Sequence, residues 1–186
     1  KGYGRSMRVI TGSARGVRLQ APKGMDTRPT MDQVKEGIFP AIQFEIEGRT
    51  ALDLFAGSGQ LGIEALSRGA AHCTFVDKGK EPIAVIRENL KKTRLEDHAT
   101  VAQADYSSYL KTCRTQFDLI LLDPPYAEIF LETALKIISE IDILTNSGII
   151  VCERSFEKSL PDEIPGLVRY RDYRYGKAAV TIFRRG

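Results

Sequence analysis

A regular alternation of strand-like and helix-like segments over residues 50–153 limits the possible folds more than any other feature of the chain. Short apolar runs rich in β-prone residues are separated by stretches with helical spacing, several of them bounded by Gly or Pro. The predicted strands are 50–55, 73–76, 100–104, 117–122 and 148–153, and the predicted helices are 61–68, 82–94, 106–112 and 129–141. Such alternation predicts an α/β fold with a parallel sheet, helices on both faces and right-handed crossovers.

The C-terminal part of the chain departs from this pattern. Residues 168–175 alternate between apolar or aromatic and charged side chains, with one break at 171–172. Gly176-Lys177 separates them from a second β-prone run at 179–183. This arrangement predicts an antiparallel hairpin added to one edge of the sheet.

The N-terminal part predicts a smaller hairpin followed by a helix. The β-prone runs 8–12 and 17–21 flank a loop that contains Gly. Thr30 and Gln33 fit a capping box, and apolar residues at helical spacing follow as far as Ile46. Pro40 lies inside this helical pattern, so we expect the helix to kink or end near 37–39.

Length and composition indicate one globular domain. The chain has 186 residues, enough for a sizeable core. We expect a domain at 31–186, preceded by a basic hairpin and link at 7–30, and we interpret residues 1–6 as an expression remnant. Three widely spaced cysteines argue against a disulfide framework or a metal site. The same cysteine usage indicates a reducing cytosol, so a cytoplasmic protein is expected. No apolar run approaches the roughly 18–20 residues that span a bilayer. We also expect a monomer.

The net charge of +3 conceals an uneven distribution. Residues 1–30 carry +6 and residues 166–186 carry +5, which leaves −8 for residues 31–165. An acidic body with two basic ends is typical of a protein that binds a polyanion, if the ends meet on one face; the alternative is solvated surface charge.

A glycine-rich turn at 57–62 follows the first predicted strand and opens a helix. The sequence Gly-Ser-Gly-Gln-Leu-Gly matches the dinucleotide-binding fingerprint, and Asp77 ends the next strand, where a carboxylate accepts ribose hydroxyls. Asp53 argues against a dinucleotide because its charge, four residues before Gly57, would repel a pyrophosphate. A cofactor with positive charge and no phosphate suits this turn better.

The segment 53–59, with its acid and Gly-x-Gly, resembles the first motif of class I S-adenosylmethionine-dependent methyltransferases. The resemblance implies a Rossmann-like, mostly parallel doubly wound sheet with the two hairpins as extensions. It also implies S-adenosylmethionine as cofactor, S-adenosylhomocysteine as product, and a role for Asp105 in accepting from the adenine amine. The implied cofactor-binding residues are Asp53, Phe55, Ala56, Gly57, Ser58, Gly59, Gly62, Asp77, Lys78, Asp105 and Tyr106.

The buried strand 117–122 ends abruptly in Asp123-Pro124-Pro125-Tyr126, which matches the fourth motif of the same family. The two prolines cannot continue a sheet ladder. An aryl amine is a poor nucleophile, and the Asp123 carboxylate and Pro124 carbonyl can accept its N–H groups and aim its lone pair at a methyl group. Tyr126 would stack on a base that is flipped or single-stranded.

The N-terminal segments 8–12, 16–19 and 27–30, with Phe39, resemble bacterial small-subunit ribosomal RNA guanine-N2 methyltransferases. This resemblance runs from Met7 to nearly the end of the chain. It implies that the substrate is one guanine of 16S rRNA, presented in an assembling 30S subunit. The expected phosphate contacts come from seven arginines: Arg8, Arg15, Arg18, Arg28, Arg169, Arg171 and Arg174.

The motif at 123–126 leaves alternatives open. An adenine-N6 methyltransferase acting on nucleic acid uses the same four residues, and an RNA-binding assembly factor could keep the scaffold without catalysis. A protein glutamine methyltransferase would carry Asn in place of Asp123. An NAD oxidoreductase is opposed by Asp53 and by the absence of a hydride-transfer acid–base pair in the sequence.

Overall fold

The computed structural model describes residues 7–24, 29–125 and 130–186, and this part of the chain is organised around a seven-stranded sheet. The strand order is β3-β2-β1-β4-β5-β7-β6. The first five strands in this order are parallel, and β7 is antiparallel to both of its neighbours. The strands are β1 Thr50–Asp53, β2 His72–Asp77, β3 Ala99–Gln103, β4 Phe117–Leu122, β5 Leu144–Ser155, β6 Leu167–Tyr175 and β7 Ala178–Arg185. The predicted parallel sheet and C-terminal edge hairpin are therefore confirmed.

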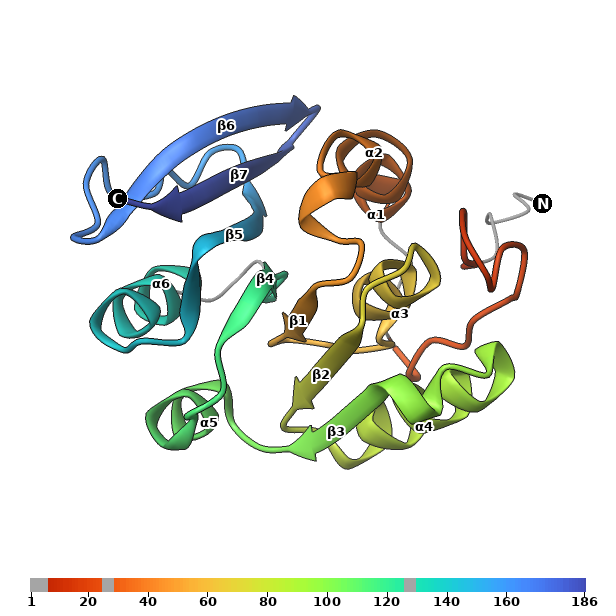
Figure 1. Cartoon of the computed structure of the whole chain (residues 1–186). Coiled ribbons are helices and arrows are strands. Elements are labelled where there is room, and N and C mark those ends of the chain that lie inside the picture. The colour runs from red at the N-terminus through yellow and green to blue at the C-terminus, as the bar shows by residue number, and fades with distance from the viewer. Residues whose placement is uncertain (1–6, 25–28, 126–129) are drawn as a thin grey trace.

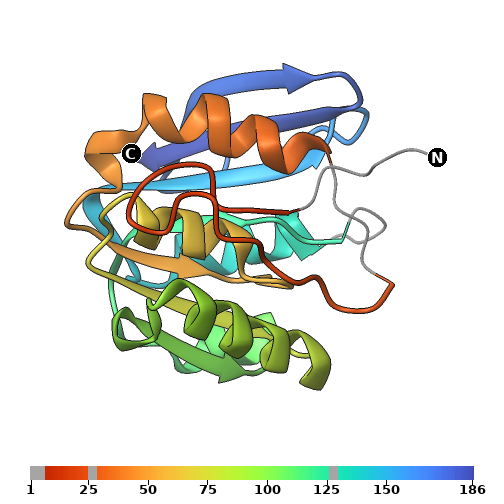
Figure 2. The ribbon, with the colours of Figure 1, turned by 90° about the vertical axis from the view of Figure 1, so that its right-hand side faces the viewer.

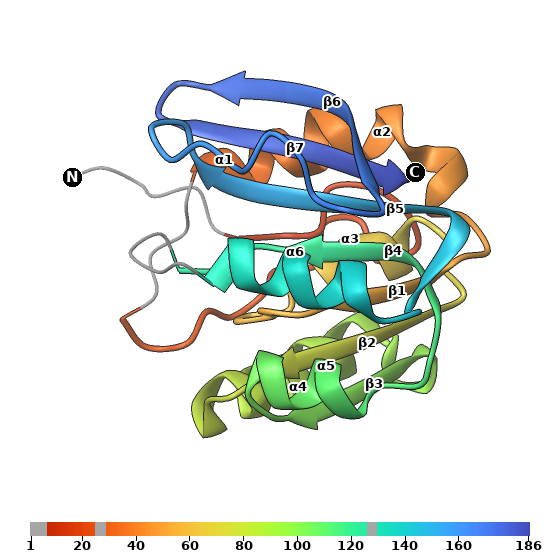
Figure 3. The same ribbon diagram turned by 90° about the vertical axis from the view of Figure 1, so that its left-hand side faces the viewer.

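The order in which successive strands are added to the sheet reverses between β1 and β4. From β1 it proceeds through β2 to β3 on one side, and from β4 to β5 on the other. The carboxyl ends of the two central strands thus lie at a topological switch point, where open α/β sheets bind their ligands. Figure 3 shows β4 and β5 running in the same direction toward that end of the sheet.

Helices cover both faces of the sheet, as Figure 1 shows. On one face lie α3 Gln60–Ser67, α4 Lys80–Thr93 and the N-terminal helical stretch, and on the other lie α5 Tyr106–Thr112 and α6 Phe130–Glu140. A short 3-10 turn, η3 Glu96–His98, precedes β3. Strand β4 supplies Leu119 and Leu121 to one core, and Ile120 and Leu122 to the other. Because β4 is buried on both faces, residues 117–122 form a nearly continuous apolar run.

The N-terminal helical stretch changes its winding around Pro40. It consists of α1 Pro29–Gln33, the π-helical η1 Val34–Ile38, α2 Phe39–Ala41 and the 3-10 turn η2 Gln43–Glu45. The backbone N–H of Phe39 donates to the carbonyl of Val34, five residues back. Pro40 has no N–H to donate to Glu36, so a wide turn just before it replaces the regular helical bonding. The irregularity expected near 37–39 is confirmed.

The N-terminal hairpin is reduced to one antiparallel bridge, between Arg8 and Arg18. The two runs still pair through their backbones, with the N–H of Val9 donating to the carbonyl of Val17 at 3.0 Å and the N–H of Leu19 to that of Met7 at 2.9 Å. The intervening backbone bonds to α3, so regular strands do not form. The N–H groups of Ile10 and Thr11 donate to the Glu64 carboxylate at 2.8 and 3.0 Å. The N–H of Ser13 donates to the Ser67 carbonyl at 2.9 Å.

The cysteines are free in this structure, and Cys73 and Cys152 are completely buried, as the sequence predicts. Burial raises the pKa of both thiols. In the described ranges, none of the helices combines the length and apolarity needed to span a bilayer. The same ranges hold no cluster of three or more His, Cys, Asp or Glu side chains suited to a metal ion.

Candidate active site

A cavity of about 700 Å³ opens at the carboxyl ends of the central strands. Four carboxylates line it, each at the end of a different parallel strand. Asp53 and Asp77 are the last residues of β1 and β2, and Asp105 and Asp123 follow β3 and β4. Parallel strands bring their carboxyl ends to one edge, so residues spread over 71 positions meet in one place. The four acids line one cavity, as the sequence predicts.

The glycine turn between β1 and α3 contributes Gly57 and Ser58 to the lining of this cavity, whereas the predicted cofactor residues Gly59 and Gly62 are not among its lining residues. Gly57 and Gly59 have φ of 57° and 81°, which is the left-handed region that favours glycine. Gly62 lies in the first turn of α3, where an added Cβ would come within 2.4 Å of the Phe75 ring. The turn therefore needs glycine for its conformation, and Gly62 is needed for the close approach of α3 to β2.

Asp53 is buried beneath this turn, with 2% of its surface exposed. Its Oδ2 accepts a hydrogen bond from the N–H of Gly62 at 3.0 Å. Burial raises the pKa of Asp53 to about 7, and the nearby charge of Asp77 adds to the rise while the Gly62 bond opposes it. A buried carboxylate with a raised pKa is stabilised by a cation, which fits a positively charged ligand at this turn.

Asp77 and Asp105 hold the backbone around the cavity. Asp77 accepts from the N–H of Gly57 through Oδ2 and from the N–H of Gly79 through Oδ1, both at 2.9 Å. Asp105 caps α5, with Oδ2 accepting from the N–H groups of Ser107 and Ser108 at 3.1 and 3.2 Å. These bonds fix the orientation of both carboxylates, and each oxygen has a further lone pair for a ligand.

Three aromatic rings from distant parts of the chain enclose the other side of the cavity. Phe55 and Tyr106 lie 5.1 Å apart between ring centroids, and Phe130 lies 6.2 Å from Phe55 and 5.1 Å from Tyr106. The ammonium of Lys78 lies 6.0 Å from the Phe130 ring. The sequence predicts Phe55, Tyr106 and Lys78 as site residues but not Phe130, because no motif marks the start of α6.

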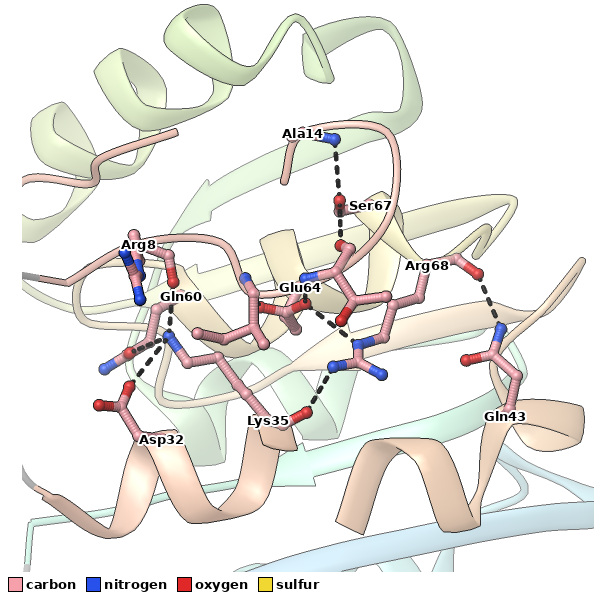
Figure 4. Close-up of polar contacts among 11 residues, drawn as sticks. Arg8, Ala14, Asp32, Lys35, Gln43, Gln60, Glu64, Ser67 and Arg68 are labelled. Carbon is pink, nitrogen blue, oxygen red and sulfur yellow. Dashed lines mark hydrogen bonds and ion pairs between the residues drawn. The ribbon is translucent and has the colours of Figure 1, made fainter. Parts of the chain in front are cut away.

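Gln60, which no sequence motif marks as a site residue, also lines the cavity at the start of α3. Its Oε1 accepts from the Lys35 ammonium at 3.0 Å, and the same ammonium donates to the carbonyl of Arg8 at 3.0 Å. Figure 4 shows how Lys35, Gln60, Glu64 and Arg68 join the N-terminal segment, the π-helical turn and α3 into one network. The N-terminal segment is thereby tied to the wall of the cavity.

Asp123 follows directly on β4, and Pro125 lines the cavity beside it. Pro124 is buried at this position and Pro125 is exposed. The structure therefore brings the carboxylate of the predicted amine-binding motif into the same cavity as the predicted cofactor residues. Tyr126 and Arg28, both predicted as functional residues, lie outside the described residues.

The predicted RNA-contacting arginines fall into two groups that the helical stretch 29–45 separates (Figure 2). Arg8, Arg15 and Arg18 are exposed on the N-terminal segment, and Arg171 and Arg174 are exposed on β6. The two basic ends are thus not adjacent. Arg169 is half-buried and donates to the carbonyls of Leu160 and Pro161 at 2.8 and 3.0 Å, so it is engaged in holding a loop.

Exposed aromatic rings accompany the arginines of the edge hairpin. The guanidinium groups of Arg171 and Arg184 lie 4.9 and 4.1 Å from the centre of the exposed Tyr170 ring, and that of Arg174 lies 3.6 Å from the Phe156 ring. Stacked rings and guanidinium groups on a surface are well suited to bases and phosphates.

Comparisons with known proteins agree with this geometry. Residues 7–184 match the family model described as conserved hypothetical protein 95. Ribosomal RNA small subunit methyltransferase D of Escherichia coli is 31% identical over 179 residues, covering 96% of this chain and 90% of that protein. YlbH of Bacillus subtilis is 45% identical over 182 residues, covering 96% of this chain and 99% of that protein. The solved structure of yhhF from Escherichia coli superposes with a TM-score of 0.87 at 29% identity, covering 97% of this chain and 98% of that one.

The sheet order, the glycine turn and the acids at the strand ends define a class I S-adenosylmethionine-dependent methyltransferase fold. Within that class, the chain belongs to the family of the matched model, which includes the small-subunit rRNA methyltransferases.

Proposed function

We propose that this protein transfers a methyl group from S-adenosylmethionine to the exocyclic N2 amine of a guanine in 16S rRNA. One observation carries the proposal: Asp123 and Pro125 line the same cavity as Asp53, Asp77 and Asp105. A motif suited to holding an amine and residues suited to holding a methyl donor therefore share one space. The 31% identical relative is named a small-subunit rRNA methyltransferase, which supports RNA as the substrate.

The residues of the cavity fit the proposed cofactor by charge and shape. Asp53 offers a buried negative charge to a cationic group, and the glycine turn lets a ligand approach the backbone closely. Asp77 and Asp105 have fixed carboxylates for ribose hydroxyls and the adenine amine, and Phe55, Tyr106 and Phe130 offer apolar faces. When bound, the cofactor supplies a methyl group activated by a sulfonium charge.

In this proposal the protein contributes positioning and electrostatics. The Asp123 carboxylate and the Pro124 carbonyl accept the two N–H groups of the target amine, which directs its lone pair toward the cofactor side of the cavity. The C–N bond forms as the C–S bond breaks, and the surplus amine proton leaves to Asp123 or to solvent. The target base must be flipped out or unpaired to reach Asp123, and Tyr126 is proposed to stack on it.

We further propose that Arg8, Arg15, Arg18, Arg171 and Arg174 contact RNA phosphates, in an assembling 30S subunit. Their exposure supports this, whereas the hydrogen bonds of Arg169 favour a structural role for that residue. Such contacts position the RNA without selecting its sequence.

The test is transfer of tritium from labelled S-adenosylmethionine to purified small-subunit particles that lack the modification, followed by analysis of the labelled nucleoside. Labelled N2-methylguanosine is the expected product. N6-methyladenosine would redirect the proposal to adenine. Particle binding without a labelled product would indicate an assembly factor, provided that S-adenosylhomocysteine binding in calorimetry shows the cavity to be intact.

A further inference from the structure

A second cavity, of about 380 Å³, is lined in part by Pro124 and Pro125. Pro125 lines both cavities, so the second one adjoins the proposed methyl-transfer site directly. Its volume lies within the roughly 300–1,000 Å³ of small-molecule sites. Its lining comes from the two prolines, from α6, from the end of β5 and from the loop that follows: Pro124, Pro125, Leu131, Glu132, Glu153, Arg154, Ser155, Glu157, Lys158, Ser159 and Leu160.

The loop wall of this second cavity is held in place by two arginines. The Nη1 of Arg154 donates to the carbonyls of Ser155, Phe156 and Lys158 at 3.4, 3.4 and 3.0 Å. Arg169 donates to the carbonyl of Leu160 at 2.8 Å from the neighbouring strand β6. Side chains anchored in the sheet therefore shape the loop before any ligand arrives, which lowers the cost of ordering it on binding.

Glu153 is the buried carboxylate of the second cavity, with 3% of its surface exposed. Strands β4 and β5 pair in register with Leu122 beside Cys152. Asp123 directly follows Leu122 and Glu153 directly follows Cys152, so both residues continue from a paired position of two strands, which are about 4.8 Å apart in sheets. One carboxylate lines the methyl-donor cavity and its neighbour lines the second cavity.

We propose that the second cavity receives the flipped target base and that Glu153 selects guanine by accepting a hydrogen bond from its N1–H. The inference rests on the proposed function and names the residue that chooses the base. Guanine carries its N2 amine next to an N1–H donor, whereas adenine carries its N6 amine next to an N1 acceptor. Two adjacent carboxylates match the adjacent donors of guanine, and a carboxylate facing the N1 lone pair of adenine would repel it. The apolar surfaces of Pro124, Leu131 and Leu160 suit the faces of the ring.

The experiment uses two small-subunit particles that differ at one nucleotide. Once labelling has mapped the methylated guanosine, the particle is assembled from ligated RNA with either guanosine or 2-aminopurine riboside at that position. 2-Aminopurine keeps the N2 amine but presents an N1 acceptor. We measure kcat/KM on both particles for the wild type, Glu153→Gln and Glu153→Asp, with Glu163→Gln as the control. Glu163 is exposed and lies outside both cavities.

The wild type should favour the guanosine particle by about tenfold to a hundredfold, the value of one charge-assisted hydrogen bond. Glu153→Gln should lose or invert this preference, because its amide N–H can donate to the N1 of 2-aminopurine. Glu153→Asp should keep the preference, and Glu163→Gln should match the wild type. Because each preference is a ratio within one variant, a smaller folded fraction does not change it.

An unchanged ratio in Glu153→Gln, with N2-methylguanosine still the wild-type product, would overturn the role of Glu153 and leave the proposed function standing. A wild-type product other than N2-methylguanosine would overturn the proposed function itself. Binding of S-adenosylhomocysteine, measured by calorimetry, should be equal in all variants because the second cavity does not hold the cofactor.

Discussion

Asp53 is a buried residue whose charge lowers the stability of the free protein and is proposed to favour a cationic ligand. Its carboxylate is enclosed by the glycine turn and by β2, with one hydrogen bond from Gly62. Burial disfavours the charged form and raises the pKa of Asp53 to about 7. The native state therefore holds its proton more tightly than the unfolded chain does. The charge that suits a cationic cofactor is the same charge that weakens the free protein.

Replacing Asp53 with Asn should stabilise the free protein at alkaline pH and weaken cofactor binding. The folded-state pKa of Asp53 lies above its unfolded value of 3.8, so the wild type loses stability as pH rises from about 4 to 7. Asp53→Asn lacks this loss. Its free energy of unfolding should therefore exceed that of the wild type by up to about 4 kcal/mol at pH 8, but by little near pH 4. Urea unfolding at both values tests this, with the exposed Asp97→Asn as control. A gain that does not vary with pH would contradict the assignment.

Asp123 should matter for transfer and not for cofactor affinity. In Asp123→Ala we expect turnover to fall by about 100-fold or more, because the amine loses a charged acceptor in the transition state. Affinity for S-adenosylhomocysteine should remain close to that of the wild type, since Asp53, Asp77 and Asp105 are intact. Single-turnover transfer and calorimetry measure the two quantities, with the exposed Asp162→Ala as control. Full turnover in Asp123→Ala would remove the residue from the mechanism.

At the scale of elements, α3 connects the sheet, the glycine turn at 57–62 and the N-terminal segment. Its first turn lies against β2 through Gly62, and its last turns bind the N-terminal backbone through Glu64 and Ser67. Arg68 and Glu64 form a buried ion pair at 3.1 Å, so each of these buried charges has a partner of opposite sign. A change in the position of α3 should therefore disturb both the cavity and the N-terminal segment.

Gly62→Ala should displace α3 from β2. The added Cβ would lie 2.4 Å from the Phe75 ring and 2.8 Å from the sulfur of Cys73, both in buried side chains. We expect a loss of about 1–3 kcal/mol in the free energy of unfolding, together with weaker S-adenosylhomocysteine binding. Gly37→Ala is the matched control, since its nearest neighbour would lie at 3.4 Å. Equal stability of the two variants in urea would contradict the close-packing argument.

Lys35→Met should weaken the network that joins the N-terminal segment to the cavity. Lys35 is fully buried, and burial lowers its pKa. Methionine has similar length but leaves the Arg8 carbonyl and the Gln60 amide oxygen without their donor. We expect a cost of about 1–3 kcal/mol in unfolding free energy and faster hydrogen exchange in residues 8–19. The exposed Lys92→Met should change neither measurement.

At the scale of the whole molecule, the candidate active site lies at one end of the sheet, and the exposed basic residues lie in two separate places. The helical stretch α1–α2 lies between the N-terminal segment and the edge hairpin of β6 and β7 (Figure 2). An RNA that contacts both would have to cross the intervening helical stretch. The two groups should therefore contribute separately to the salt dependence of binding.

Arg15→Ala and Arg171→Ala should each reduce the slope of log K against log salt by about 0.7–0.9. Because the two residues lie on separate segments, the double variant should show the sum of both changes. Filter binding to small-subunit RNA over a range of salt concentrations measures the slopes. Arg114→Ala, which removes an exposed arginine near α5, should leave the slope unchanged. Unaltered slopes in both single variants would assign the basic ends to ordinary solvated surface.

The sequence by itself determined the seven strands of the sheet, most of the helices and the four acids of the site. These features follow from local patterns: period-two or continuous apolar runs, glycines at a turn, and prolines that stop a strand. Helix 106–112 and strand 117–122 have the predicted bounds, and the π-helical turn occurs where Pro40 predicts an irregularity. Such local patterns do not predict the order of the strands in the sheet.

Tertiary structure alone decided which distant residues share a surface. Phe130 meets Phe55 across the cavity, Lys35 is buried against Gln60, and Arg169 turns to the loop at Leu160 instead of to solvent. The second cavity also arises only when α6, β5 and the loop after β5 are packed together. The physical reason is that periodicity reports the face of one element, whereas a contact between elements depends on how their side chains pack across the whole fold.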